Sequence, residues 1–380
     1  MNRVEWCEYS ANFGERDSEL MVRSYDTLMG NVYEEREGYE WSPYRCITPG
    51  KKSFPGIWNW DSAFHAIGVS RWDLELAKES ILGFLKFQRE DGALADLAWE
   101  RGGVADNASK PPVFAFAVET VYKRDKDIDF LREVYPKLAK EESFWSEQRS
   151  YKGLFFYDAD EKEEKWYYQR AKNTSGWDNS PRWDEGIVQY WAVDLNCFMV
   201  MYYRSLAFIA RELGLCGDSD MWQKKGKTVE ELINEKLWDD ESACYFDVDR
   251  YTLKPLRVKT PACFMPLYIG IASNERADAM RVIAQKDFRD RMPTVAFEHP
   301  AYSNDYWRGP TWLNVAYFAA KGLKNYGFDV ADRIKENILD MCFGEKGGIY
   351  ENYDSVTGKG LCCDHFSWSS VFIIEFILNF

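Results

Sequence analysis

A run of nine residues, Ser-Gly-Trp-Asp-Asn-Ser-Pro-Arg-Trp at positions 175–183, sets one carboxylate between two indole rings. Trp177 directly precedes Asp178, and Trp183 follows it in a segment marked by glycine and proline. Apolar neighbours raise the pKa of a carboxylic acid because they desolvate its charged form. A carboxyl that stays protonated near neutral pH can donate a proton, and tryptophan rings suit the apolar face of a sugar. The run therefore predicts that Asp178 is a general acid in a sugar-binding loop.

Arg182 lies four residues after Asp178 and acts in the opposite direction. A nearby cation lowers the pKa of a carboxyl group. Arg182 is therefore expected either beside the substrate or in a structural ion pair with Asp178.

A glycosidic bond is hydrolysed by two carboxyl groups, one that protonates the leaving oxygen and one that activates water or attacks carbon. The candidates for the second group are Asp61, Asp305, Glu351 and Asp354. Glu351 follows two glycines and lies between Tyr350 and Tyr353, in a segment that resembles the one around Asp178. Glu351 is therefore expected to be the general base, and the alternative is that it orders a turn.

Two further clusters combine aromatic and charged side chains. Asp61 ends the run Trp-Asn-Trp-Asp at 58–61, where it can cap a helix or accept hydrogen bonds from sugar hydroxyls. Arg308 lies within Tyr-Trp-Arg-Gly-Pro-Thr-Trp at 306–312. It can brace the base, bind an anionic group or pair with a neighbouring carboxylate.

No motif for a metal ion or a cofactor stands out. The three histidines are not spaced as metal ligands, and the run Cys-Cys-Asp-His at 362–365 is only a weak metal motif. The chain has no glycine-rich phosphate loop, dinucleotide fingerprint or G-x-S-x-G elbow. The sequence predicts neither a metal nor a cofactor.

The bulk composition limits the partners and the location. A net charge of -14 argues against nucleic acid and anionic membranes, because both need a basic surface. The apolar runs are too short to span a membrane. Nine scattered cysteines without a C-x-x-C pair, together with a polar N-terminal segment, predict a reducing cytoplasm. The 16 tryptophans suit both a large core and carbohydrate binding.

The hydrophobic pattern predicts two alternating kinds of helix and little strand. The amphipathic kind begins at aspartates that can cap a helix, namely Asp73, Asp127, Asp218 and Asp329, and includes residues 16–37 and 274–286. The other kind is apolar on nearly all sides, which is typical of a buried helix. These helices are expected at Trp60–Ser70, Pro111–Tyr122, Ile187–Leu213, Pro261–Ile271, Pro310–Leu323 and Phe366–Phe380.

Six buried helices alternating with six amphipathic ones predict an inner ring enclosed by an outer ring, which is an all-α (α/α)6 barrel or six-hairpin toroid. Such a toroid can occupy the whole chain, so residues 1–380 are expected to form a single catalytic domain. If the inner helices run parallel, the segments that precede them meet at one rim. The clusters around Asp61, Asp178, Arg308 and Glu351 all fall in such segments, where functional residues tend to concentrate.

Several motifs together resemble glycoside hydrolase family 63, and most of all its compact mannosylglycerate-hydrolase-like branch. The motifs are Trp58-Asn-Trp-Asp-Ser62, Ser175-Gly-Trp-Asp-Asn-Ser-Pro-Arg182, Tyr306-Trp-Arg-Gly-Pro-Thr-Trp312, and Glu351-Asn-Tyr-Asp with Phe366-Ser-Trp368. Trehalases of family 37 have a similar S-G-W-D signature. The resemblance covers roughly residues 40–380 and implies an (α/α)6 barrel that hydrolyses an α-glycosidic bond with inversion.

By motif match, the resemblance implies that Asp178 is the general acid and Glu351 the general base. Inversion requires the two carboxyl groups to stand roughly 6.5–9.5 Å apart, which leaves room for water. The residues expected to bind the substrate are Trp58, Trp60, Asp61, Lys110, Trp177, Asn179, Arg182, Tyr306, Trp307, Arg308, Trp312 and Trp368.

Two positions depart from the family pattern and concern the substrate. Thr174 stands where many relatives have Glu, and Lys110 where many have Gln. Lys110 suits an anionic aglycone such as glycerate, or it is a solvated surface lysine. The additional β-domain of larger relatives is not found, which favours a small soluble α-glucoside or α-mannoside, either an oligosaccharide or a glycosylglycerate.

Two other functions remain open at the level of sequence. One is a sugar epimerase or isomerase on the same toroid, although such enzymes commonly use histidine pairs and this chain has three scattered histidines. The other is a non-catalytic carbohydrate-binding protein, which would not need both carboxylates.

Overall fold

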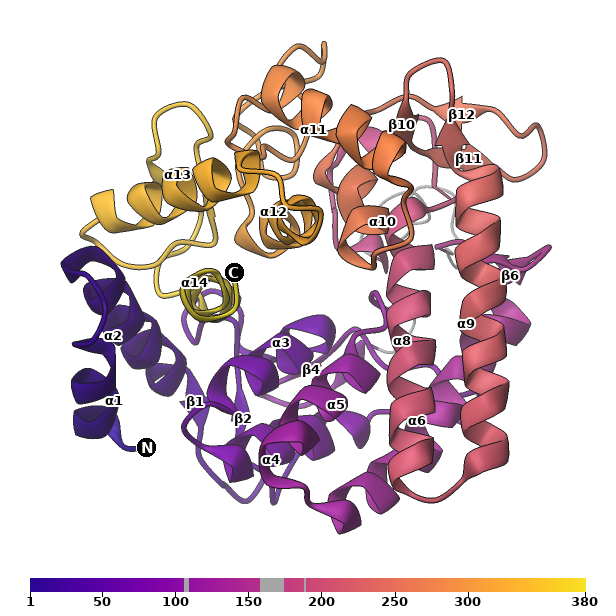
Figure 1. The fold of residues 1–380 in the computed structure, drawn as a ribbon. Helices are drawn as coiled ribbons and strands as arrows, with labels where there is room; N and C mark the ends of the chain where they lie inside the picture. The colour runs from indigo at the N-terminus through magenta and orange to yellow at the C-terminus, as the bar shows by residue number, and fades with distance from the viewer. Residues whose placement is uncertain (106–108, 158–173, 188) are drawn as a thin grey trace.

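The computed structural model describes residues 1–105, 109–157, 174–187 and 189–380, in which helices dominate (Figure 1). The inner helices are α3 (Asn59–Val69), α5 (Phe114–Asp125), α8 (Val193–Glu212), α10 (Met265–Tyr268), α12 (Leu313–Asn325) and α14 (Ser367–Leu378). The outer helices are α2 (Glu15–Gly30), α4 (Leu74–Leu85), α6 (Ile128–Gln148), α9 (Cys216–Lys236), α11 (Asn274–Asp287) and α13 (Val330–Gly344). Helix α1 (Arg3–Ser10) precedes them, and the 3-10 turns η1 (Pro181–Trp183) and η2 (Pro261–Phe264) precede α8 and α10.

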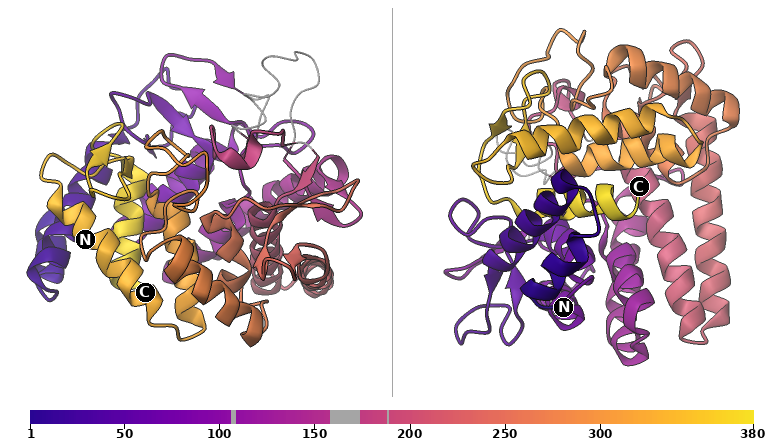
Figure 2. Two further views of the ribbon diagram at one scale, coloured as in Figure 1. Left: turned by 90° about the horizontal axis from the view of Figure 1, so that it is seen from above. Right: turned by 60° about the vertical axis from the view of Figure 1, so that its left-hand side comes forward.

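The inner helices follow one another around a closed ring (Figure 1). Contacts join α3 to α5, α5 to α8, α8 to α10, α10 to α12 and α12 to α14, and α14 returns to α3. Outer helices pack against this ring, as α4 does on α3, α9 on α8 and α13 on α12. Helix α2 packs on α14, so the first and last parts of the chain are neighbours (Figure 2).

Burial separates the two sets of helices, as the hydrophobic pattern predicts. Every residue of α3 is buried, and so is the whole stretch Ser367–Phe376 of α14. Outer helix α9 instead buries a single stripe that includes Trp222, Gly226, Val229 and Ile233, whose spacing of three and four is typical of an amphipathic helix. One continuous hydrophobic cluster extends from Trp6 to Phe376.

Two of the four predicted aspartate caps are confirmed. The Asp73 carboxylate accepts a hydrogen bond from the Leu76 amide of α4, and Asp127 caps α6 in the same way. The prediction for Asp218 is wrong, because α9 already begins at Cys216 and the Asp218 carboxylate accepts the Tyr135 hydroxyl instead. Asp329 precedes α13 but has helical backbone angles and makes no capping bond.

Three predicted helices differ in extent. Helix α8 begins at Val193 rather than near Ile187, because Tyr190 and Trp191 pair with strand β11. The predicted helix from Pro261 to Ile271 divides into η2 and a four-residue α10, with a second proline at 266. Helix α2 ends at Gly30, well before residue 37, and the chain continues there into a short strand.

The strands are only two or three residues long and lie between the helices. They are β1 (Val32–Tyr33), β2 (Cys46–Ile47), β3 (Gly56–Trp58), β4 (Leu97–Trp99), β5 (Val104–Ala105), β6 (Ser150–Tyr151), β7 (Leu154–Phe155), β8 (Tyr190–Trp191), β9 (Trp238–Asp239), β10 (Cys244–Tyr245), β11 (Asp247–Asp249), β12 (Pro255–Leu256), β13 (Asn352–Tyr353) and β14 (Gly360–Leu361). The antiparallel β3–β4–β5 sheet ends beside the start of α3, and the β13–β14 hairpin follows Glu351 directly. Among the described helices, none combines the length and the apolar character needed to cross a membrane.

Candidate active site

The segments before the inner helices converge on one cavity of about 400 Å³, counted with its open mouth. Its walls are formed by Pro49, Phe54, Trp58, Trp60, Asp61, Lys110, Gly176, Asp178, Tyr306, Trp307, Trp312, Glu351, Phe366 and Trp368. These residues come from the segments before five of the six inner helices and from the first turns of two of those helices, so the structure brings together the clusters that the sequence places on one rim. The segment at Lys259–Thr260, also expected on this rim, does not contribute to the cavity.

Asp178 lies in the loop between Gly176 and η1, against the tryptophan-rich wall. Burial raises the pKa of its carboxyl to about 6, and the positive charge of Lys110 opposes that rise. Gly176 explains how the loop comes so close to that wall. Its φ is +75°, and a Cβ atom there would lie 2.3 Å from the Trp60 ring. Only glycine combines this backbone angle with this contact, so the position of Asp178 depends on Gly176.

Glu351 lies on the same cavity, at the start of the β13–β14 hairpin. Burial raises the pKa of its carboxyl to about 7, and the Tyr306 hydroxyl, which donates to Oε1 at 2.9 Å, works against the rise. The negative charge of Asp178 raises the Glu351 pKa further, so the two carboxyls interact electrostatically. Tyr306 itself has a φ of +51°, a conformation that is uncommon for a tyrosine and costs energy. The geometry thus directs its hydroxyl to Glu351.

Asp61 is the third carboxyl group on the cavity. It lies in the first turn of α3, where the exposed amides of the helix favour negative charge. The cap position itself is taken by Trp58, so Asp61 is not the residue that caps the helix. Burial raises the pKa of Asp61 to about 8, and Lys110 is the main group that opposes this rise.

Aromatic rings form most of the remaining wall. Trp307 and Trp312 stack in parallel with their centroids 3.8 Å apart, and Trp60 meets Trp368 edge to face. In the described part of the chain, the buried indole Nε1 atoms of Trp58 and Trp368 have no hydrogen-bond partner. A buried donor without a partner is costly and is usually satisfied by a ligand or water. The cavity therefore offers apolar faces together with donors, which is what a sugar ring requires.

Four residues expected to bind the substrate lie outside the cavity wall. The Arg182 guanidinium is fully buried and pairs with Asp194 and Asp247 at 2.8–2.9 Å, so it pairs neither with Asp178 nor with a substrate. Trp177 is 1% exposed and lies behind the wall, with its ring 5.0 Å from that of Trp307.

Asn179 and Arg308 join two loops beside the cavity. The Asn179 side chain accepts the Trp307 amide at 2.8 Å and donates to the Asp305 carboxylate at 3.0 Å. Arg308 binds both carboxylate oxygens of Asp184 and the carbonyl oxygen of Asn179. These bonds hold the Asp178 loop against the segment that carries Tyr306, so both residues support the site from outside.

The other carboxylates considered as partners of Asp178 have structural contacts. Asp305 accepts the Asn179 amide, as above, and Asp354 orders a turn by accepting the amides of Val356 and Thr357. Neither residue lines the cavity. Only Glu351 and Asp61 remain beside Asp178, and Asp61 lies at a helix start.

Sequence reasoning did not predict a site role for Asp96, Phe54 or Phe366, although Phe366 belongs to one of the motifs that carry the family resemblance. Asp96 lies within an apolar run before β4 and gives no local signal, yet its Oδ1 is 3.3 Å from the Lys110 ammonium. Phe54 and Phe366 are aromatic residues at the starts of predicted rim segments, so their composition could have indicated them.

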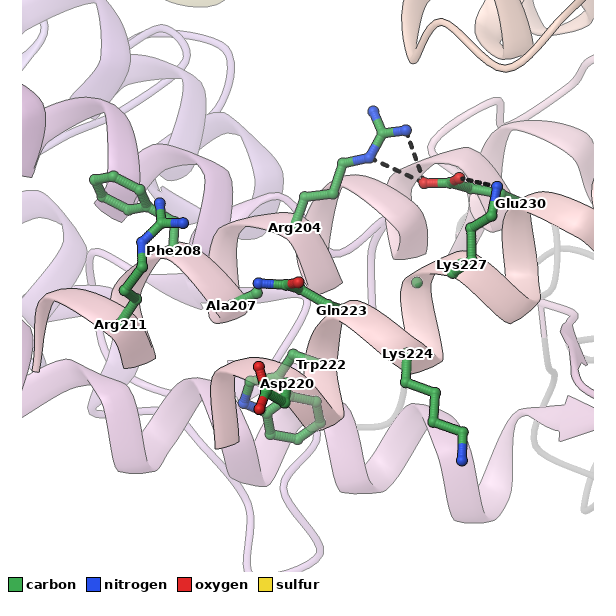
Figure 3. A pocket seen from close by; sticks show the side chains of 11 residues that line it. Arg204, Ala207, Phe208, Arg211, Asp220, Trp222, Gln223, Lys224, Lys227 and Glu230 are labelled. Atoms are coloured by element: carbon green, nitrogen blue, oxygen red, sulfur yellow. Dashed lines mark hydrogen bonds and ion pairs between the residues drawn. The ribbon is translucent and has the colours of Figure 1, made fainter. Parts of the chain in front are cut away.

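A metal site and a second pocket were the alternatives to this cavity as the functional site. Within the described ranges, no group of three or more His, Cys, Asp or Glu side chains is placed to hold a metal ion. A larger hollow of about 1070 Å³ lies on the outer surface between α8 and α9 (Figure 3). There Arg204 and Lys227 both engage Glu230, whereas Arg211, Asp220 and Lys224 form no ion pair with the other side chains drawn. This hollow shares no residue with the cavity of Asp178.

The sequence and the ring of helices are both similar to those of known enzymes. A family model described as the mannosylglycerate hydrolase MGH1-like glycoside hydrolase domain matches residues 54–369. The chain is 28% identical to a mannosylglycerate hydrolase from Thermus thermophilus, over 85% of this chain and 94% of that protein. It is 25% identical to a mannosylglycerate hydrolase from Rubrobacter radiotolerans, over 87% of this chain and 92% of that protein.

Solved structures agree. A GH63 mannosylglycerate hydrolase from Thermus thermophilus, in complex with glucose, superimposes with a TM-score of 0.79 at 25% identity, over 95% of this chain and 100% of that one. Neutral trehalase Nth1 from Saccharomyces cerevisiae shares the fold, with a TM-score of 0.71 at 19% identity over 88% of this chain and 73% of that one. The protein is therefore a glycoside hydrolase. Within that class, the chain belongs to the MGH1-like mannosylglycerate hydrolase family, as the sequence motifs imply.

Proposed function

We propose that this protein is an inverting α-glycosidase, with Asp178 as general acid and Glu351 as general base. One observation carries the proposal: the buried Glu351 and the half-buried Asp178, both with raised pKa values, line a single aromatic cavity. Groups of this kind are how enzymes perform acid and base chemistry near neutral pH. The closed ring of inner helices supports an (α/α)6 barrel as the architecture, with residues 1–380 as one catalytic domain.

The proposed reaction takes place in one displacement. Asp178, protonated, gives its proton to the glycosidic oxygen as the bond to the anomeric carbon breaks. Glu351, ionised, takes a proton from a water molecule that attacks the same carbon from the opposite face, which inverts its configuration. Asp61 and the free indole N–H groups of Trp58 and Trp368 would hold the sugar hydroxyls, and Tyr306 would keep Glu351 in place.

The proposed substrate is a small soluble α-mannoside or α-glucoside, with glycosylglycerates foremost. The relatives described above are mannosylglycerate hydrolases, and a Thermus thermophilus enzyme of this kind has been solved with glucose and with Tris and D-glycerate. The cavity of about 400 Å³, which includes its solvent-filled entrance, is at the small end of the usual range for ligand pockets. The cytoplasmic location indicated by the cysteine usage stays a prediction.

A hydrolysis screen tests the proposal. The panel is mannosylglycerate, glucosylglycerate, trehalose, kojibiose, nigerose and sucrose, with the product anomer followed by proton NMR. We expect at least one α-glycoside to release a sugar whose first-formed anomer is β. Retention of the α configuration contradicts the assigned mechanism. Unbroken but isomerised sugar points to an epimerase, and binding without turnover across the panel points to a lectin-like protein.

Substitution of the two carboxyls tests their roles. Asp178→Asn and Glu351→Gln each remove proton transfer while keeping the side-chain shape, so kcat should fall about 10²–10⁴-fold. Asp129→Asn, at an exposed carboxylate of α6, is the matched control and should leave kcat unchanged. Circular dichroism checks that each variant is folded. Wild-type turnover by Glu351→Gln on a cleaved substrate would show that the base lies elsewhere.

A further inference from the structure

Lys110 is buried in the cavity wall rather than solvated on the rim. It directly precedes Pro111, before α5, and its side chain is 7% exposed. The Nζ atom lies 3.3 Å from Oδ1 of Asp96, whose side chain is 12% exposed. A surface lysine that reaches out to an aglycone would lie in solvent. Lys110 instead points back into the protein, toward a carboxylate that the sequence did not indicate.

Asp96 is held in place through its backbone. Its amide donates to the Ala105 carbonyl oxygen at 2.7 Å, and its own carbonyl accepts the Asn59 amide at 2.9 Å. The first bond ties Asp96 to β5, and the second ties it to the first residue of α3. Because Asp61 lies two residues further along α3, the Lys110–Asp96 pair is fixed beside the start of the helix that carries Asp61.

Lys110 pairs with Asp96 and lines the same cavity as Asp61 and Asp178. The Lys110 charge lowers the pKa values of Asp61, Asp96 and Asp178, each of which burial raises. Among the described residues, Lys110 is the only cation that contributes strongly to the pKa values of these three carboxyl groups. The charge of Lys110 is therefore already shared among carboxylates of the protein from three elements.

The remaining charged and titratable neighbours of the cavity are Glu351 and Tyr306. The negative charge of Glu351 raises the pKa of Asp61. The charges of Glu351 and Asp178 both raise the pKa of the Tyr306 hydroxyl. All of these groups are acids. Among the described residues that line the cavity, Lys110 is the one cation beside three carboxyl groups, and buried carboxylates left unpaired are strongly destabilised.

We propose that Lys110 is a positioning residue: held by Asp96, its ammonium is the internal counter-ion of Asp61 and Asp178, and it is not a ligand for an anionic aglycone. The inference rests on the proposed function, in which Asp178 is the acid and Asp61 holds sugar hydroxyls. The Lys110 charge lowers the pKa of Asp61, so it widens the pH range in which Asp61 is ionised and can accept two hydrogen bonds from the sugar. An anionic aglycone would therefore have to bind to a different cationic residue.

The first test needs no substrate. Carboxyl carbons of the full-length protein, labelled with carbon-13 aspartate, are titrated by NMR, with Asp61→Asn and Asp178→Asn used for assignment. In Lys110→Met both carboxyls should titrate about 1 unit higher than in the wild type, the size expected when a neighbouring cation is removed. Lys110→Arg, which keeps the charge, should restore both values. Unchanged titrations of Asp61 and Asp178 overturn the proposal.

Lys259→Met is the matched control. Lys259 also precedes an inner segment and is paired, with Asp287 at 2.6 Å, but it does not line the cavity. Its loss should leave both carboxyl titrations unchanged. If Lys110→Met does not fold because Asp96 is left unpaired, Lys110→Gln serves in its place, since an amide can donate to Asp96 without carrying charge.

The second test uses kinetics on two substrates that the wild type cleaves, one neutral α-glycoside and one glycosylglycerate. Without Lys110, Asp178 keeps its proton to higher pH, so the alkaline limit of kcat should move up. The pKa of Asp61 rises as well, so the pH above which Asp61 is ionised and KM is lowest should also move up. Both substrates should lose kcat/KM by the same factor. A loss confined to the glycosylglycerate shows that Lys110 binds the aglycone and refutes the proposal. A wild type inactive on every substrate counts against the proposed function, and the titrations still decide the role of Lys110.

Discussion

At the residue scale, the two proposed catalytic carboxyls have pKa values in the same range. Burial brings that of Asp178 to about 6 and that of Glu351 to about 7. The mechanism needs the first protonated and the second ionised, so the pair must hold a single proton. Interacting groups titrate as a pair, and a rate that depends on them reports the values of the pair.

The pH profile of kcat/KM should therefore be bell-shaped, with its maximum between about pH 6 and 7. Below the maximum Glu351 takes up a proton and can no longer act as base. Above it Asp178 loses its proton and can no longer act as acid. Initial rates on a cleaved substrate across a buffer series measure the profile, and a rate that is flat through the neutral range contradicts the assignment.

Tyr306→Phe should shift one side of this bell only. The lost hydroxyl donates to Glu351 and lowers its pKa, so its removal raises that pKa. Because the pKa of Glu351 is already the higher of the pair, this change moves the alkaline side of the bell to higher pH and lowers its maximum. A hydrogen bond to a charged group is worth about 1.5–3 kcal/mol, which corresponds to a shift of about 1 unit or more. Tyr326→Phe, which removes a hydroxyl bonded to the Ala272 carbonyl, is the control and should leave the profile unchanged. A uniform loss of rate without a shift would mean that Tyr306 only packs.

At the element scale, the loop that carries Asp178 is anchored by Arg182. This residue lies in η1, and its guanidinium forms bidentate pairs with Asp194 at the start of α8 and with Asp247 in β11. Its carbon Cζ also lies 4.4 Å from the centroid of the Trp183 ring. One buried cation thus joins the loop that carries Asp178, an inner helix and a strand.

Arg182→Met should cost about 3–5 kcal/mol of unfolding free energy, because it leaves two buried carboxylates without their partner. Arg257→Met removes a comparable double ion pair, with Asp239 and Glu241, whose arginine side chain is 44% exposed. Exposed pairs contribute little, so that control should cost at most about 1 kcal/mol. Urea unfolding of both variants measures the difference, and similar costs would contradict a structural role for the Arg182 network.

At the scale of the whole molecule, closure of the inner ring depends on close contacts between successive helices. Gly322 in α12 lies against α10, and a Cβ atom there would be 2.8 Å from the Tyr268 backbone nitrogen and 3.1 Å from the Leu267 Cβ. Backbone cannot move aside as a flexible side chain can. The helices of the ring can therefore approach this closely only where a side chain is absent.

Gly322→Ala should lower stability by about 1–3 kcal/mol, the usual cost of overpacking. Gly30→Ala at the end of α2 is the control, because nothing lies within 4 Å of its added Cβ. Alanine favours the helix over glycine, so that variant should be as stable as the wild type or slightly more stable. Thermal unfolding compares the two, and equal melting temperatures would show that the α10–α12 contact can relax.

The sequence predicted much of this fold and its cavity, and the reason is that the relevant signals are local. The alternation of apolar and amphipathic helices is readable from the spacing of neighbouring residues, and the caps at Asp73 and Asp127 follow from their position before such helices. Helix ends were predicted less well. The late start of α8 depends on the pairing of Trp191 with Val248, a partner distant in the sequence.

By itself, the sequence determined the pair of Asp178 and Glu351 as candidates and the ring of helices that brings them to one cavity, because residue type and periodicity are properties of the chain alone. Only the tertiary structure decided which carboxylates the neighbouring cations pair with. Arg182 is four residues from Asp178 yet pairs with Asp194 and Asp247, and Lys110 lies buried against Asp96 instead of in solvent. The physical reason is that burial and the choice among distant partners set the energy of a charge, and neither exists until the chain has folded.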